Sequence, residues 1–396
     1  MKIQRPSEGS KSKSRENLPK VTSFLMGLLR IYMKNKSQTF YSLIFFASSL
    51  FLFYGCPDKK PCPTCPPPGS DTTSHNFVWH IDTLGDGGGS SLYDVAIIND
   101  NLAYAVGEIQ KKDSTGKYEP LPYNFVKWNG NRWQLTHIEF PLYNYDCTVA
   151  GYASVPAQAI FAFSANSIII TDGWAVMLGN GSSFAPLSCI STSIWKGTIL
   201  KFWGTSSNDF YAVGRNGMIA HYYNNNWQKI ESGTTLDIRD IWGAFDPNTS
   251  EQQILAVASN DYEKRLLRIQ GTTVSFLADS GLPRSITGIW FAVNKQYYII
   301  GDGIFYSNTF NPLKWEGVPN QITSFFTTRV RGIGWNDLVI VGAFGEVLHY
   351  NGSSWMSYRS YTALENGVFG GLTMKGNLII AVGQDNQRAI IGIGRR

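Results

Sequence analysis

The stretch WGTSSNDFYAVGRNGMIAHYYNNNW, residues 203–227, decides the fold because its central run, DFYAVG, has close relatives along the chain. Each relative is a short run of apolar and aromatic residues that ends at a small residue or at threonine. Such self-similarity at a nearly fixed spacing is the sequence signature of a repeat architecture. The seven runs end at Gly107, Thr171, Gly214, Ala258, Gly301, Gly342 and Gly383.

The spacing of these runs is regular, with steps of 64, 43, 44, 43, 41 and 41 residues. Most units have an apolar strand before the run, such as LKFWG or IRDIWG, and several have a third strand after it, such as GMIAHYY or GEVLHY. A polar turn and a tryptophan then follow at Trp133, Trp227 and Trp355. Each unit is therefore predicted to form four short antiparallel strands in about 42 residues, which is the blade of a β-propeller.

Other architectures do not account for the pattern. No stretch after residue 56 has a sustained helical period, which excludes an α-solenoid, and a β-sandwich or single barrel does not need seven equivalent strand ends. Because they recur with the repeat, Trp203, Trp242 and Trp290 are expected to pack between blades, and His221 and His349 are expected to be structural. The chain is predicted to be an all-β, seven-bladed propeller.

The ends of the repeat region predict how the ring closes. The last unit has only three strands before the sequence ends at Arg396, which would leave an unpaired edge. The segment NFVWHID, residues 76–82, lies before the first unit and resembles an outer strand, with Trp79 in register with Trp227. We expect this segment to supply the fourth strand of the last blade.

The positive charge of the chain is confined to its beginning. Residues 1–55 carry nine Lys or Arg and two Glu, so their net charge is +7, whereas the remainder has a net charge of −2. The predicted propeller therefore has no strong positive field for a polyanion. Nucleic acid is not expected as a partner.

The segment from Met33 to Cys56 has the layout of a secretory signal: a short cationic start, an apolar run and a small residue, Gly55, before the cysteine. This layout resembles a bacterial lipoprotein signal, which implies that Cys56 is lipidated and anchors the protein to a membrane in the cell envelope, outside the cytoplasm. An uncleaved anchor helix is the alternative. Residues 1–32 fit neither reading, so we expect translation to start at Met33.

The sequence after the signal predicts two further regions, a Pro-rich tether over residues 56–75 and the propeller over 76–396. Cys62 and Cys65 in the tether have the spacing of a redox or zinc motif, but a lone pair is weak support, so an oxidised loop or free thiols are expected. Cys147 and Cys189 could pair in an oxidising compartment.

The pattern WG…ND(F/V)YAVG…G.I.HY…W resembles the tryptophan-rich bacterial propellers related to photosystem assembly factors and to sialidase-like repeats. More closely, LYDVAIIND, AYAVGEI, GEVLHYNG and IGIGRR resemble a family of bacterial propeller lipoproteins. The resemblance covers residues 75–396. It implies the fold and no particular activity, because propellers carry many unrelated functions.

Apart from the weak spacing of Cys62 and Cys65, no motif for catalysis, metal binding or a cofactor is found, and no catalytic residue, metal or cofactor is predicted. The turn motif of sialidase repeats is missing. Arg239 and Arg331 occupy similar places beside inner strands and could both face the central channel, where they would be candidate ligand contacts. Asp94, Asp237 and Asp240 also lie near inner strands, but sequence cannot give the separation that an acid and base pair needs.

The first step exceeds the others by about 20 residues, in two insertions at 108–124 and 139–158, and loops that interrupt a rigid repeat often carry binding function. The second insertion is rich in tyrosine, so Tyr143, Tyr145 and Tyr152 are candidate contacts with a protein or glycan. The sequence thus favours a tethered binding or scaffold module for an envelope protein or glycan. A glycan-active hydrolase or lyase and an assembly factor for another envelope protein are the alternatives.

Overall fold

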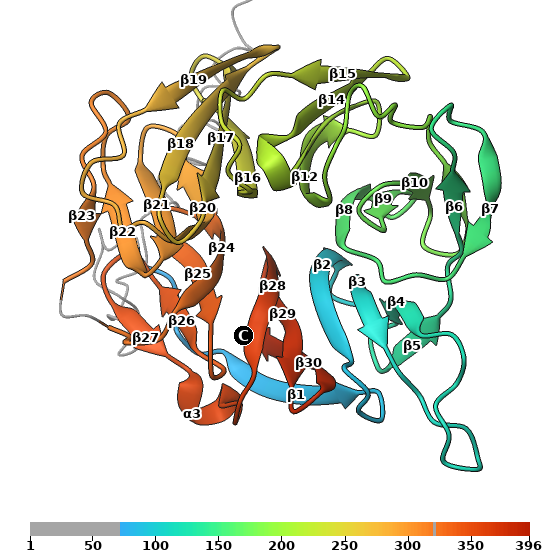
Figure 1. Cartoon of the computed structure of the whole chain (residues 1–396). Coiled ribbons are helices and arrows are strands. Elements are labelled where there is room, and N and C mark those ends of the chain that lie inside the picture. The colour runs from blue at the N-terminus through green and yellow to red at the C-terminus, as the bar shows by residue number, and fades with distance from the viewer. Residues whose placement is uncertain (1–71, 320–321) are drawn as a thin grey trace, which may run out of the picture. The chain divides into compact units, whose positions relative to one another are not determined.

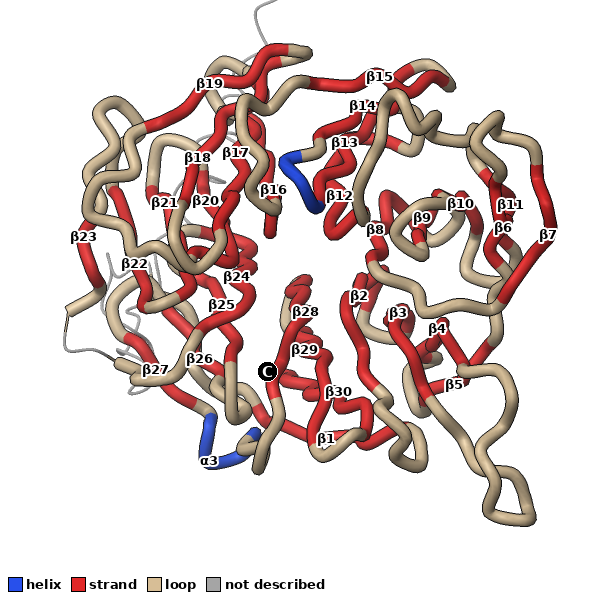
Figure 2. Tube along the Cα trace, viewed as in Figure 1, coloured by secondary structure: helices blue, strands red, loops and turns tan. Residues whose placement is uncertain are grey.

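A computed structural model describes residues 72–319 and 322–396 of the chain. Over these residues, seven four-stranded antiparallel sheets stand around a common axis, with almost no helix (Figures 1 and 2). The predicted seven-bladed propeller is confirmed. The leader, Cys56, Cys62, Cys65 and most of the tether lie outside the described residues. Within the described part, no helix has the length and apolar character of a membrane span.

The first four blades follow one another along the chain. They consist of β2 (Ser91–Asn99), β3 (Leu102–Ile109), β4 (Tyr123–Trp128) and β5 (Trp133–Thr136); β8 (Ala159–Ser164), β9 (Ser167–Thr171), β10 (Val176–Gly179) and β11 (Phe184–Pro186); β12 (Ile199–Ser206), β13 (Asp209–Gly214), β14 (Ile219–Tyr223) and β15 (Asn226–Ile230); and β16 (Ile238–Phe245), β17 (Gln252–Ser259), β18 (Lys264–Gln270) and β19 (Thr273–Leu277).

The other three blades complete the ring. They consist of β20 (Ile286–Ala292), β21 (Gln296–Gly301), β22 (Gly303–Ser307) and β23 (Glu316–Gly317); β24 (Thr327–Gly334), β25 (Asp337–Gly342), β26 (Val347–Tyr350) and β27 (Trp355–Ser357); and β28 (Val368–Lys375), β29 (Leu378–Asp385), β30 (Arg388–Arg395) and β1 (Val78–Leu84). Outside the blades are the hairpin β6 (Phe140–Tyr143) and β7 (Val149–Ala153), the 3-10 turn η1 (Arg215–Gly217) and the short helix α3 (Arg359–Thr362).

The recurring tryptophans hold neighbouring blades together. Trp203 is 6% exposed and lies against Gly243 of the next blade, where any side chain would collide with the indole ring. Trp290 packs in the same way against Gly332, which directly follows Arg331 in the strand sequence VRGIG. The WG pattern therefore has a packing origin, since a tryptophan from one blade needs a glycine in the next. The predicted structural role of these tryptophans is confirmed.

The ring closes through β1, as the sequence predicts. β1 pairs antiparallel with β30 along its whole length and opposes Trp79 to Gly394. The partner of Gly394 in β29 is Ile379, which lies four residues before Gly383, the end of its run. In blade 3, two steps across the sheet lead from Trp227 to Phe210, which takes the equivalent place in its own run. The predicted register of Trp79 with Trp227 is therefore confirmed. Phe77, just before β1, is 6% exposed.

A chain of hydrogen bonds fastens the segment before β1 to blade 6. His75 Nδ1 lies 2.8 Å from His349 Nδ1, and His349 Nε2 lies 2.9 Å from Asp337 Oδ1. His75 Nε2 lies 3.0 Å from the Ser354 hydroxyl. If both rings are neutral, Ser354 donates to His75, His75 donates to His349, and His349 donates to Asp337.

Acidification is expected to destabilise the closed ring. Burial, the neighbouring His349 and the charge of Arg396 lower the pKa of His75, while Asp337 opposes them. Because the unfolded chain then binds the proton more readily, stability is full above pH ~6.5 and falls as pH drops below that value. Thermal melts of His75→Gln between pH 7 and 5 should show a weaker pH dependence. His80→Gln, which changes an exposed histidine in β1, should keep the pH dependence of the parent. If both variants lost this pH dependence to the same extent, the role of His75 would be contradicted.

Candidate functional site

The central channel is lined by one equivalent residue from each inner strand. Six inner strands have a β-bulge after their first or second pair, and the residue that follows the bulge takes an equivalent place in each strand. Strand β8 lacks this bulge and offers an apolar side chain. The seven equivalent residues are Asp94, Ile160, Lys201, Asp240, Gly288, Arg329 and Gly371. The channel cluster consists of the four charged ones together with Arg331.

One half of the channel cluster is the pair formed by Lys201 and Asp94. Lys201 Nζ lies 2.5 Å from Asp94 Oδ1, and both side chains are at least nine-tenths buried. Asp94 also accepts hydrogen bonds from the backbone N–H of Val95 at 3.0 Å and of Ile160 at 3.2 Å. Burial lowers the pKa of Lys201 to about 8, against the opposing charge of Asp94. Both carboxylate oxygens of Asp94 thus have partners.

The other half centres on Asp240, which is fully buried. Arg331 donates to both of its carboxylate oxygens at 2.8 Å, and Arg329 Nη1 lies 3.3 Å from Oδ1. Burial would raise the pKa of Asp240, but the charges and hydrogen bonds of Arg331 and Arg329 outweigh it and lower the pKa to about 2. The Arg331 guanidinium also lies over the ring of Trp242, 5.2 Å from its centroid.

The structure does not bring the two expected channel arginines together. Arg331 belongs to the channel cluster, but Arg239 is the bulged residue of β16, and its side chain is 43% exposed beside Asp237 at 3.7 Å. In the repeat, Arg239 corresponds to Thr328, whereas Arg331 takes the position of Trp203 in blade 3. The assignment of Arg239 and Arg331 to similar positions is wrong, because the bulges shift the strand register.

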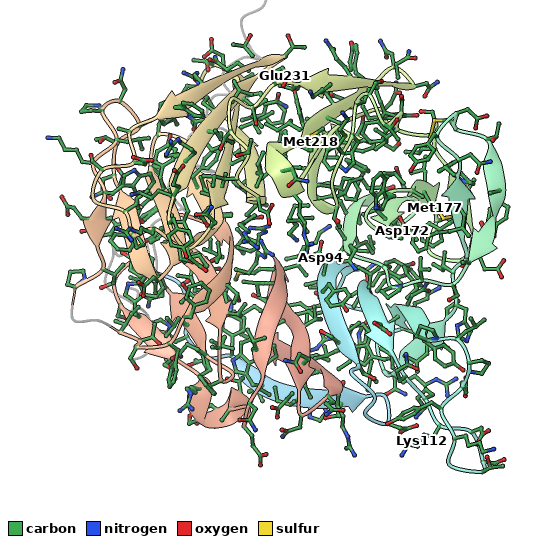
Figure 3. The ribbon with its side chains drawn as sticks, viewed as in Figure 1. Asp94, Lys112, Asp172, Met177, Met218 and Glu231 are labelled. Carbon is green, nitrogen blue, oxygen red and sulfur yellow. A yellow bond between two sulfur atoms is a disulfide. The ribbon has the colours of Figure 1, made fainter. Side chains whose placement is uncertain are left out.

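Beside the channel cluster is a cavity of about 200 Å³. Its lining includes Asp94, Lys201 and Arg331, and Figure 3 shows Asp94 near the centre of the ring. Each carboxylate of the cluster is held by a cation, so neither is placed to act as a free acid or base. Among the described residues, no group of three or more His, Cys, Asp or Glu side chains is arranged to hold a metal ion. The cluster fits the role of a structural core.

The second insertion forms a different feature at the rim of the ring. The hairpin β6–β7 lies beside blade 2 (Figure 1), and a disulfide joins Cys147 in its turn to Cys189, in the segment between blades 2 and 3. A cavity of about 440 Å³ opens between hairpin and blade. We call it the rim hollow; its main lining residues are Leu142, Tyr143, Tyr145, Asp172, Trp174 and Ile190.

The three predicted tyrosines have different places around the rim hollow. Tyr143 is half-buried, packs against the core between blades 1 and 2, and donates to the Leu187 carbonyl at 3.4 Å. Tyr145 also lines the hollow and is 90% exposed. Tyr152 lies on β7 opposite Pro141, outside the lining. Tyr143 therefore anchors the hairpin, and Tyr145 is free to contact a ligand.

Two lining residues of the rim hollow come from the turn between β9 and β10. Asp172 accepts hydrogen bonds from the backbone N–H groups of Trp174 and Ala175, each at 2.8 Å, and burial raises its pKa. Trp174 is 54% exposed even though it is a large aromatic residue. The turn thus presents a half-buried carboxylate beside an exposed indole.

Sequence reasoning missed Lys201 and Arg329 in the channel and Asp172 and Trp174 at the rim. A signal for the first two was present, because Asp94, Lys201, Gly288 and Arg329 each precede the final glycine of the following run by 13 residues. Asp172 directly follows Thr171, the residue that replaces glycine in blade 2. That departure from the repeat indicated an unusual turn after Thr171, but it did not indicate that the hairpin β6–β7 lies beside this turn.

These features define a class of protein: a seven-bladed β-propeller with an ion-paired channel and one disulfide-bonded hairpin at its rim. The chain matches no protein-family model and no curated protein sequence. Among solved structures it is similar to YCF48 bound to D1 peptide, at 13% identity and a TM-score of 0.60, over 82% of this chain and 99% of that one.

Two further solved structures are similar at comparable levels. YCF48 from Cyanidioschyzon merolae shares 12% identity with a TM-score of 0.54, over 80% of this chain and 98% of that one. A catalytically inactive virginiamycin B lyase from Staphylococcus aureus, with quinupristin, shares 10% identity with a TM-score of 0.54, over 81% and 100% of the two chains. At these identities the likeness shows the propeller fold alone.

Proposed function

We propose that this chain is a membrane-tethered binding or scaffold module that binds a segment of another envelope protein outside the cytoplasm of a bacterium. The observation that carries the proposal is the rim hollow. It lies where the chain breaks its repeat. It exposes Tyr145, on a hairpin that a disulfide holds to the propeller, and Trp174, in the turn between β9 and β10 of blade 2. Exposed aromatic side chains on a rigid frame are typical of protein interfaces.

Other observations support parts of this proposal. The Cys147–Cys189 disulfide suits an oxidising compartment, and the signal before Cys56 suits a lipid anchor. One similar structure holds a peptide, which shows that a propeller of this size can bind a polypeptide segment. A factor that holds an envelope protein during its assembly would use the same kind of surface. The glycan-active alternative has no such support, since Asp94 and Asp240 are held by cations.

Replacing the hairpin should abolish partner binding. The mature, anchored protein is cross-linked in native envelopes and compared with a variant in which a short turn replaces residues 139–158 and Cys189 is changed to Ser. We expect the cross-linked partners to be lost, because the variant lacks one wall of the rim hollow. The matched control shortens the other insertion, at residues 112–117, and should keep them. An unchanged set of partners in the hairpin variant would refute the proposed site.

The same preparation tests the tether. Cys56→Ser removes the predicted site of lipidation, so this variant is expected to move from the membrane fraction to the soluble extracytoplasmic fraction. A variant that stays fully membrane-bound would contradict the lipid anchor while leaving the binding surface unaffected.

A further inference from the structure

The rim hollow contains a carboxylate without a cationic partner. Asp172 accepts two backbone hydrogen bonds through Oδ1, but no lysine, arginine or histidine of the described residues pairs with it. Burying a carboxylate costs free energy unless a charge or enough hydrogen bonds compensate. Asp172 differs in this way from Asp94 and Asp240, which are each paired with a cation in the channel cluster.

The charge distribution around the rim hollow is one-sided. Between Arg132 and Lys196 the sequence has no lysine and no arginine, although it has three carboxylates, Glu139, Asp146 and Asp172. This segment supplies the hairpin, all of blade 2 and the whole lining of the hollow. The hollow is therefore a weakly negative surface in which a cation would meet no like charge.

The other lining groups suit a cation as well. Trp174 and Tyr145 are exposed aromatic residues, and their ring faces attract ammonium and guanidinium groups. Leu142 and Ile190 offer apolar surface for the methylene stem of a long basic side chain. At about 440 Å³, the hollow has room for one such side chain and the backbone next to it.

We propose that the rim hollow binds a lysine or arginine side chain of a partner polypeptide, with Asp172 pairing with the cation and Trp174 and Tyr145 covering it. The inference rests on the proposed function and names what the site recognises. The rim hollow then recognises the positive charge of the ligand as well as its apolar surface.

A bead-displayed library of random peptides tests the inference with the mature chain as the probe. Sequences that bind should be enriched in Lys and Arg, and binding should depend on the hairpin over residues 139–158. For a selected peptide, Asp172→Asn is expected to raise the Kd about tenfold, equivalent to about 1.4 kcal/mol, and acetylation of a peptide lysine should have a similar effect. Trp174→Ala should also weaken binding.

The matched control is Asp146→Asn, since Asp146 is an exposed acid of the same hairpin that does not line the hollow. This variant should keep both the enrichment and the Kd. An equal loss in Asp146→Asn would mean general electrostatic attraction and would overturn the inference. Hairpin-dependent binding without enrichment in basic residues would also overturn it but leave the proposed function standing. Binding that does not depend on the hairpin would contradict both.

Discussion

Deletion of residues 76–82 is expected to abolish the cooperative unfolding of the propeller. The deletion removes most of β1, so the backbone edge of β30 loses its partner strand. It also removes Phe77 and Trp79, which pack with Tyr358 and Phe369 in one core cluster. Loss of a buried Phe or Trp costs about 3–5 kcal/mol each, against a total stability of about 5–15 kcal/mol for a typical domain.

The measurement is a thermal or denaturant melt followed by circular dichroism. The variant should show a broad transition, and a synthetic peptide spanning residues 72–88 should restore the sharp one by rebinding along β30. The matched control is Val78→Ala, which changes a residue of β1 that is 77% exposed, and its effect should stay within about 0.5 kcal/mol. If the deletion variant melted sharply at the temperature of the parent, β1 would not be the closing strand.

Asp240→Asn is expected to destabilise the propeller by about 3–5 kcal/mol, because it leaves the buried Arg329 and Arg331 without their counter-charge. The matched control is Asp237→Asn, three residues earlier, where the carboxylate is partly exposed and lies 3.7 Å from Arg239. Its cost should be below about 1 kcal/mol. Equal effects of the two variants in denaturant melts would show that the channel cluster has no special role.

The role of Asp240 also has a signature in acid. Its pKa of about 2 lies below the usual value for aspartate, so the folded state binds the proton less readily than the unfolded chain. This contribution to the free energy of unfolding is complete above pH ~4, is lost as pH falls toward 2, and amounts to about 2 kcal/mol.

The double variant Asp240→Asn/Arg331→Gln should lose less stability than the sum of the losses in the two single variants, since the two residues share one ion pair.

The fold could be predicted because its signals are local. Each unit around DFYAVG or one of its relatives alternates strands and turns within about 42 residues, and this order produces the same blade in every unit. The missing strand of the last unit and the Trp79 pattern were enough to predict closure and its register. These features depend on side-chain alternation and turn residues, which can be read from one unit at a time.

The candidate site was only partly accessible from the sequence. The insertion at 139–158 and its tyrosines stood out because they interrupt the repeat, and two of the three tyrosines line the rim hollow. Asp172 and Trp174 lie in blade 2, about 15 residues beyond the insertion, and no spacing rule links them to it. In the channel, the bulges decide which residue of each inner strand points inward, so Arg239 and Arg331 looked equivalent when they were not.

The sequence by itself determined the seven blades, the tryptophan packing between them and the closing strand, since each depends on a pattern that repeats within a single unit. Only the tertiary structure decided which charges meet at the axis and what lies beneath the hairpin. Asp240 and Arg331 are 91 residues apart in the chain, and the disulfide from Cys147 to Cys189 spans 42. Such contacts arise when the ring closes, because closure brings together residues whose separation in the sequence follows no local rule.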